Sequence, residues 1–186
     1  KLAPLSETDL AGHLRSIETV PGLIIDLRSY PDYLVYPLAG AFVEKRTPFV
    51  QFTKCDLSNP GAYLWRDVVE IPPAGPRYPG RVTVLVDESS QSRAEYFAMA
   101  LAAGPRTTIV GARTAGADGD VAPMPLPGGL VAYLSGNGIF YPDRAPTQQV
   151  GVKIDVPCSP TIAGIRAGRD EILECALQTL KRDEAR

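Results

Sequence analysis

Histidine is almost missing from this chain. His13 is the only one among 186 residues. It falls in SETDLAGHLRSIETV, which has the pattern of a helix that ends before Pro21. A Ser-His-Asp triad formed within this chain would have to use that one imidazole. We expect His13 to be a surface or packing residue.

Cysteine is also scarce. Cys55, Cys158 and Cys175 are odd in number and far apart, and no two of them have the spacing of metal ligands. A disulfide framework or a zinc site therefore has little support, and we expect all three to be free core or surface thiols. We expect no cofactor and no metal.

Long runs of basic or apolar residues are absent. Nineteen Lys and Arg and 21 Asp and Glu give a net charge of -2, and no basic run could neutralise a phosphate backbone, so nucleic acid is not an expected partner. No apolar run reaches the roughly 18 to 20 residues that span a bilayer. The opening KLAPLSETDL lacks the pattern of a signal peptide, so we expect any export signal to lie upstream.

The residues that are present favour an α/β fold. Short apolar runs rich in β-branched residues predict buried strands at residues 22–27, 81–88 and 107–111, with a last strand at 150–156. Helical spacing of apolar residues predicts helices at 91–103 and 169–180. Strands that alternate with helices indicate a largely parallel sheet.

Three further segments carry weaker signals. A strand is expected around residues 49–52. The Pro- and Gly-rich segment 56–80 is expected to be a surface connection at its end. The runs GLVAYLSG and GIFYP predict a hairpin or ribbon that turns at residues 136–138.

Three serines lie between the second predicted strand and its helix, in VDESSQSRAEYFAMALA. Ligands of parallel sheets bind beyond the carboxyl ends of the strands, where a helix N-terminus offers free N–H groups. A serine there can attack a carbonyl while the next backbone N–H holds the developing oxyanion. Alternatively, Ser89 and Ser90 are turn and N-cap residues.

A loop dense in glycine and proline follows the third predicted strand and reads GARTAGADGDVAPMPLPGG. It lies where the chain would return to the same edge of the sheet. So many glycines indicate unusual φ angles or a close approach of the backbone to something else.

The order GLIIDLR, VTVLVDESSQSRAE, TTIVGARTAGADGD, a β ribbon, YPD, TQQVGVKIDV and a closing helix resembles the tail-specific protease, or C-terminal processing peptidase, family of serine peptidases. The resemblance covers about residues 22–180. The ending PTIAGIRAGRDEILECAL resembles the secreted or lipoprotein branch of that family in Bacteroidetes-like bacteria.

This resemblance implies a crotonase- or Clp-protease-like β-spiral with flanking helices. It implies a polypeptide substrate and an exported bacterial protein of the periplasm or cell envelope. We expect residues 1–186 to form one catalytic domain, a fragment that lacks an upstream PDZ-like or N-terminal region. The oligomeric state stays open.

The serine-x-serine-x-x-glutamate signature of the family falls on Ser90, Ser92 and Glu95, with the nucleophile at Ser92. The backbone N–H of Arg93 would be one oxyanion donor. The family's second donor comes from a glycine-rich loop after the first strand. Here that loop is RSYPDY, so the donor falls on the backbone of Asp32 or Tyr33. Tyr30, Tyr33 and Tyr36 are either a wall facing the substrate or packing residues.

The general base is the main departure from the family. Members with a Ser-Lys dyad have lysine where this chain has Ala117. The tricorn-type branch has glutamate at the position of Gln148, which can orient a neighbour but carries no charge, and its histidine lies upstream of Lys1. Asp118 and Asp120 are the local carboxylates that could replace the base, or they form a solvated loop pair.

Two functions follow from this pattern. The first is a serine-type peptidase that forms an acyl-enzyme on Ser92. The second is a catalytically impaired module that binds extended peptides as an added strand. The residue within hydrogen-bond reach of Ser92 distinguishes them. An esterase is disfavoured because no serine lies in a GxSxG motif.

Overall fold

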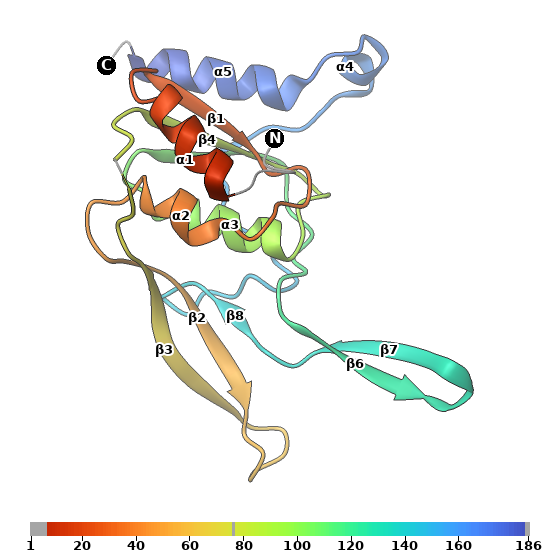
Figure 1. The fold of residues 1–186 in the computed structure, drawn as a ribbon. Helices are drawn as coiled ribbons and strands as arrows, with labels where there is room; N and C mark the ends of the chain where they lie inside the picture. Colours follow the sequence, from red (N-terminus) through yellow and green to blue (C-terminus); the bar gives the residue numbers. More distant parts are fainter. Residues whose placement is uncertain (1–6, 76, 185–186) are drawn as a thin grey trace.

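A four-stranded parallel sheet forms the centre of the computed structural model, which describes residues 7–75 and 77–184 (Figure 1). The strands follow the order β1-β4-β5-β9, and every neighbouring pair is parallel. Their bounds are β1 (Gly22–Asp26), β4 (Arg81–Val86), β5 (Thr107–Gly111) and β9 (Val156–Pro157).

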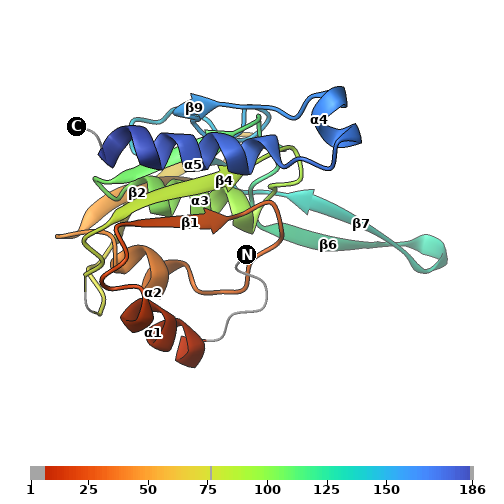
Figure 2. The same ribbon diagram turned by 90° about the horizontal axis from the view of Figure 1, so that it is seen from above.

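Helices cover both faces of this sheet (Figures 1 and 2). On one face lie α1 (Glu7–Ser16), α2 (Val35–Gly40) and α3 (Arg93–Ala102). The short α4 (Ile162–Arg166) leads into α5 (Glu171–Glu184), which covers the other face.

The side chains of β4 explain its continuous apolar sequence. Val84 packs into the large core cluster that includes Phe97 of α3. Leu85 points the other way and packs in the second cluster with Ile172 and Ala176 of α5. Successive side chains of a strand face opposite sides of the sheet, so a strand covered on both faces has no polar side.

Two antiparallel groups extend from this body. One is the sheet β3-β2-β8, with β2 (Thr47–Cys55), β3 (Tyr63–Ile71) and β8 (Ile139–Phe140). The other is a ribbon of β6 (Val121–Leu126) and β7 (Leu130–Ser135), which reaches away from the helices (Figure 1).

The hairpin predicted to turn at residues 136–138 is wrong. Strand β7 pairs antiparallel with the preceding strand β6, and the turn Pro127–Gly129 joins them, with a φ of 83° at Gly128. Strand β8 instead pairs with β2, with Phe52 opposite Ile139. Gly128 and Gly129 both adopt positive φ and reverse the chain between β6 and β7, whereas Gly138 bonds to Thr53 of β2 and leads the chain toward β2.

The end of the segment 56–80 is, in its described residues, a connection without helix or strand, as predicted, and its prolines at 72, 73 and 79 lie there; the same segment also contains β3, which was not predicted. The last predicted strand is reduced to Val156–Pro157. The remaining predicted strands and helices lie where expected to within a few residues, and the α/β class is confirmed.

Candidate active site

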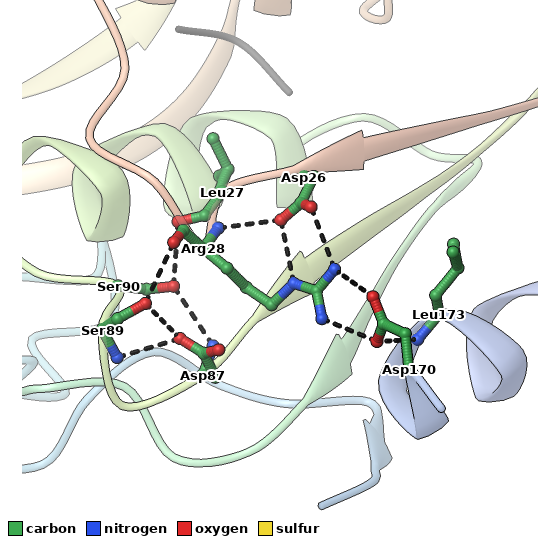
Figure 3. A network of polar contacts seen from close by, with 8 residues as sticks. All are labelled: Asp26, Leu27, Arg28, Asp87, Ser89, Ser90, Asp170 and Leu173. Atoms are coloured by element: carbon green, nitrogen blue, oxygen red, sulfur yellow. Dashed lines mark hydrogen bonds and ion pairs between the residues drawn. The ribbon is translucent and has the colours of Figure 1, made fainter. Parts of the chain in front are cut away.

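Three loops meet at the carboxyl ends of β1, β4 and β5. A network around Arg28 fixes the first loop (Figure 3). The Arg28 guanidinium donates to both Asp26 oxygens at 2.9 Å and to both Asp170 oxygens at 2.8 Å. Hydrogen bonds to these two carboxylates raise the pKa of Arg28, with Asp170 contributing most. The network therefore joins the end of β1 to the segment that begins α5.

Ser89 and Ser90 are held in the turn after β4 (Figure 3). Ser90 is fully buried, and its hydroxyl donates to Leu27 O at 2.9 Å and accepts from Asp87 N at 3.1 Å. The Ser89 hydroxyl lies 2.5 Å from Asp87 Oδ1 and 3.0 Å from Arg28 O. Both hydroxyls therefore join the loops after β1 and β4.

Ser92 differs from its two neighbours. It is the N-cap residue of α3, a role that the sequence had suggested for Ser89 or Ser90. Its φ of 52° and ψ of -118° are unusual for a residue with a side chain. It is half-buried and lines a cavity of about 620 Å³. Strained backbone of this kind gathers at functional sites, because the surrounding structure must hold it in place.

Glu95 holds the glycine-rich loop against the start of α3. Its carboxylate is fully buried. One oxygen accepts from Thr114 Oγ1 at 2.6 Å and from Gly116 N at 2.8 Å. The other accepts from Ala117 N at 2.9 Å and from Ser92 N at 3.2 Å. With four donors around it, this carboxylate positions the backbone of Ser92.

Arg93 connects the start of α3 to the loop after β1. Its guanidinium lies 4.1 Å from the ring centroid of Tyr33 and 5.0 Å from that of Tyr30. It also donates to Pro31 O at 3.0 Å. Asp32 is exposed beside this clamp. Arg93, Tyr30 and Tyr33 line the cavity with Ser92.

Asp118 lies on the glycine-rich loop and lines the same cavity. Only 7% of the residue is exposed. Its Oδ1 accepts from Gly119 N at 2.9 Å, whereas its buried Oδ2 has no hydrogen-bond partner among the described residues. Burial raises the pKa of Asp118 to about 7, and the negative charges of Glu95 and Asp120 add to the effect.

Gln148 supports Asp118 from behind. Its Nε2 donates to Asp118 O at 2.8 Å and to Asn137 O at 2.9 Å. Its Oε1 accepts from Ile139 N at 3.4 Å. Gln148 is therefore committed to backbone groups, and it orients the turn that carries Asp118.

Aromatic side chains form much of the cavity wall. The hydroxyls of Tyr36 and Tyr96 are hydrogen-bonded at 3.1 Å, and Phe52 packs beside Tyr96. Sequence reasoning raised the three tyrosines of the first loop but missed Phe52 and Tyr96. Aromatic residues in a predicted strand and a predicted helix beside the site were the available signal, but no pattern in β2 or α3 sets these two apart.

The family's usual bases are absent from the cavity. No lysine or histidine lines it among residues 7–75 and 77–184. His13 is exposed on α1, and Lys153 pairs with Asp143 at 3.0 Å. Ala117, where the resemblance leads one to expect a lysine, is exposed.

Neither metal nor membrane features are found in the described part of the chain. No three His, Cys, Asp or Glu residues gather there to hold a metal ion. None of its helices is both long enough and apolar enough to cross a bilayer.

Comparison with solved structures shows a shared fold. A candidate peptidase from Parabacteroides merdae is 23% identical with a TM-score of 0.84, covering 96% of this chain and 58% of that one. Mature CPAF bound to lactacystin is 17% identical with a TM-score of 0.72, covering 94% and 45%. The photosystem II D1 C-terminal processing protease is 20% identical with a TM-score of 0.59, covering 93% and 42%.

The chain thus spans little more than half of the Parabacteroides protein and less than half of the other two. No curated protein sequence matches it. The model of peptidase family S41 matches residues 4–158, most of the chain. This chain belongs to peptidase family S41.

Proposed function

We propose that this chain is the catalytic domain of a serine-type peptidase that cleaves polypeptides through an acyl-enzyme on Ser92. The observation that carries the proposal is the placement of Ser92. It begins α3 with a strained backbone and lines a cavity of about 620 Å³, while Ser89 and Ser90 are occupied in the turn behind it.

In this mechanism Ser92 Oγ attacks the carbonyl carbon of the scissile peptide bond. The hydroxyl proton goes to a base, and the carbonyl oxygen becomes an oxyanion. The backbone N–H of Arg93 faces it, with a second donor from the backbone of Asp32 or Tyr33. The C–N bond then breaks, the amine leaves with a proton, and water hydrolyses the acyl-enzyme to return Ser92.

Asp118 is the base in this proposal. It shares the cavity with Ser92, it has one buried oxygen without a described partner, and burial brings its pKa to about 7. A base with a pKa near the working pH is partly ionised and still accepts a proton well. Glu95 and Gln148 act as positioning residues, because both are bonded to the loops that carry Ser92 and Asp118.

The absence of a lysine at residue 117 supports a second candidate function. In that case the domain binds extended peptides without cleaving them at an appreciable rate, because removal of a general base costs about 10² to 10⁴ in rate. The same cavity would serve, and Ser92 would only contact the peptide.

A fluorophosphonate probe tests the first function directly. We expect it to label the chain at Ser92 and to label Ser90→Ala equally well, with no labelling of Ser92→Ala. Peptide mapping by mass spectrometry identifies the residue. Labelling that survives in Ser92→Ala rejects Ser92 as the nucleophile. No labelling of a chain that binds peptides favours the binding module.

The closing segment also supports an exported location, in the periplasm or cell envelope, and the resemblance to C-terminal processing peptidases supports capture of substrates by their C-terminal ends. Fractionation of cells that produce the parent protein tests the location. Comparison of peptides with free and amidated C-termini tests the capture.

A further inference from the structure

Two of the three cysteines lie on opposite sides of one packing interface. Cys158 directly follows β9, and its N–H donates to Gly111 O of β5 at 2.8 Å, so the backbone of the central sheet fixes its place. Cys175 lies on α5, the helix that covers this face of the sheet (Figure 2). Both side chains pack against the apolar cluster that contains Leu85 and Ala176.

The Cys158 thiol lies against the turn of α5 that precedes Cys175. Its Sγ donates to Glu171 O at 3.5 Å. In an α-helix this carbonyl also accepts from the N–H four residues later, which belongs to Cys175. Helical side chains tilt toward the N-terminus of the helix, so the Cys175 side chain extends toward the carbonyl that Cys158 contacts. The two side chains are in turn hydrogen-bonded to each other.

Both thiols are free in this structure, and both residues are only partly buried. Burial raises the pKa of Cys158 to about 12, and the hydrogen bond with Cys175 adds to the effect. The thiolate, rather than the thiol, attacks a disulfide. Cys158 holds its proton firmly and is therefore not the first of the two to react. Partial exposure leaves Cys175 open to a small oxidant.

The third cysteine does not compete for either partner. Cys55 ends β2, which belongs to a different sheet from β9. Its Sγ lies 3.4 Å from Gly136 O, at the turn before β8. Cys158 and Cys175 therefore form the one pair of cysteines that the described fold brings together.

We propose that Cys158 and Cys175 form an intramolecular disulfide when the protein meets a small-molecule disulfide such as oxidised glutathione. The Cys175 thiolate attacks one sulfur of the oxidant and releases the other half, which takes up a proton and leaves as a thiol. Cys158 Sγ then attacks Cys175 Sγ, gives up its proton, and displaces the second half as a thiol. Two cysteine thiols are oxidised, and one disulfide of the oxidant is reduced to two thiols.

This bond ties the closing helix to the central sheet and encloses residues 159–174. That segment contains Asp170, which pairs with Arg28 at 2.8 Å, so the disulfide also restrains the far end of the Arg28 network. A disulfide that closes a loop of about 15 residues stabilises a protein mainly by restricting its unfolded chain. The inference goes beyond the proposed function, because no step of it involves Ser92.

Peptide mapping of the full chain tests the pairing. The protein is incubated with oxidised glutathione, the remaining thiols are blocked with iodoacetamide in urea, and the chain is digested with trypsin. Cleavage after lysine and arginine places the two cysteines on peptides 154–166 and 170–181. We expect these peptides to be linked, with the loss of two hydrogen atoms, and to separate in dithiothreitol. Cys55 should carry iodoacetamide or a single glutathione.

Thermal unfolding tests the effect on stability. Cys55→Ser removes the unpaired thiol and serves as the background for all comparisons. In this background the oxidised protein should have a Tm about 5–10 °C above that of the protein reduced with dithiothreitol. Cys158→Ala and Cys175→Ala should show no such difference between the two conditions. Each variant is compared with itself, so any loss of packing caused by alanine cancels.

Several results overturn the proposal. They are alkylation of both Cys158 and Cys175 after oxidation, a linked peptide that contains Cys55, and dimers joined through either cysteine on a non-reducing gel. An oxidised protein that is no more stable than the reduced one also contradicts it. The peptide map needs no substitution, so it decides the pairing even where an alanine variant fails to fold.

Discussion

The guanidinium of Arg93 lies 4.1 Å from the ring centroid of Tyr33, on the loop that follows β1. Its hydrogen bond to Pro31 O adds a second contact to the same loop. In the proposed mechanism the backbone N–H of Arg93 faces the oxyanion. The Arg93 side chain thus holds the loop that carries the second candidate donor, the backbone of Asp32 or Tyr33.

Removal of this clamp should affect the rate more than substrate binding. We expect Arg93→Ala to lower kcat about tenfold or more, with a smaller change in KM, since a loosened oxyanion donor acts mainly on the transition state. Arg93→Lys keeps the charge but loses the planar stacking on the two tyrosine rings, so its kcat should lie between those of the unchanged protein and Arg93→Ala. Equal kcat values for all three proteins would contradict the clamp.

Glu95→Gln tests the buried carboxylate between α3 and the glycine-rich loop. Four donors surround Glu95, and an amide turns one of its two acceptors into a donor. We expect a loss of about 3 kcal/mol in the free energy of unfolding, measured with urea, and weaker probe labelling of Ser92.

Thr114→Val provides the comparison for Glu95, since it removes only one of the four donors. Thr114 Oγ1 also accepts from Val152 N at 3.0 Å, so we expect a loss of about 1–2 kcal/mol. A Glu95→Gln variant that is as stable as Thr114→Val would show that the backbone N–H groups do not depend on this charge.

The central sheet could be predicted from sequence because its signals are local. Each of β1, β4 and β5 is a short apolar run rich in β-branched residues, and burial on both faces requires that composition. The partner of β7 could not be predicted, because glycine-containing turns flank it on both sides. The strand after the second turn, β8, pairs instead with β2, which lies far upstream in the sequence. Strand β3 was missed because Arg66, Asp67 and Glu70 interrupt its apolar residues, so it contains no continuous apolar run of the length of a strand.

The sequence could single out Ser92 as a candidate nucleophile, but it could not describe the surroundings of this residue. The strand-to-helix junction marks three serines, and the motif order of the family selects one. The hydroxyls of Ser89 and Ser90 are hydrogen-bonded to the carbonyls of Arg28 and Leu27, which lie more than 60 residues upstream. Asp118 was one of two carboxylates in the glycine-rich loop, and its burial comes from packing that no local pattern reveals.

Ser90→Ala and Ser89→Ala should separate structural serines from the nucleophile. Ser90 is fully buried and bonded to Leu27 O and Asp87 N, so its loss leaves a buried carbonyl and a backbone N–H without their partner. We expect Ser90→Ala to lose about 1–3 kcal/mol in the free energy of unfolding. Ser89 is exposed and should lose less. The reverse order of stabilities in thermal unfolding would refute these roles.

Asp118 should make both stability and activity depend on pH. Burial raises its folded pKa to about 7, well above the ordinary value of about 3.9 in an unfolded chain. Between these values the folded state holds a proton that the unfolded state has released, so stability falls as the pH rises from about 4 to 7. In the proposed mechanism, kcat/KM rises over the upper part of the same range as the carboxylate forms.

Asp118→Asn should lose both pH dependences, with a fall of about 10²-fold or more in kcat/KM. Asp120→Asn is the matched control, because Asp120 lines the same cavity but is exposed, and it should keep the profile near pH 7 with a small shift. Unfolding in urea and initial rates, both measured from pH 5 to 9, check the two effects. A retained activity profile in Asp118→Asn would remove Asp118 as the base.

The backbone strain at Ser92 predicts that glycine at this position gives a more stable protein than alanine. With a φ of 52°, this residue adopts a conformation that costs a side-chain-bearing residue about 1–3 kcal/mol, and glycine avoids that cost. Glycine also gains freedom in the unfolded chain, worth up to about 1 kcal/mol. We therefore expect Ser92→Gly to be about 1 kcal/mol more stable than Ser92→Ala, although neither reacts with the probe. Since both lack the hydroxyl, the difference in their urea midpoints isolates the backbone. An alanine variant at least as stable as the glycine variant would mean that the backbone of residue 92 is not strained. Backbone strain would then no longer distinguish Ser92 from Ser89 and Ser90.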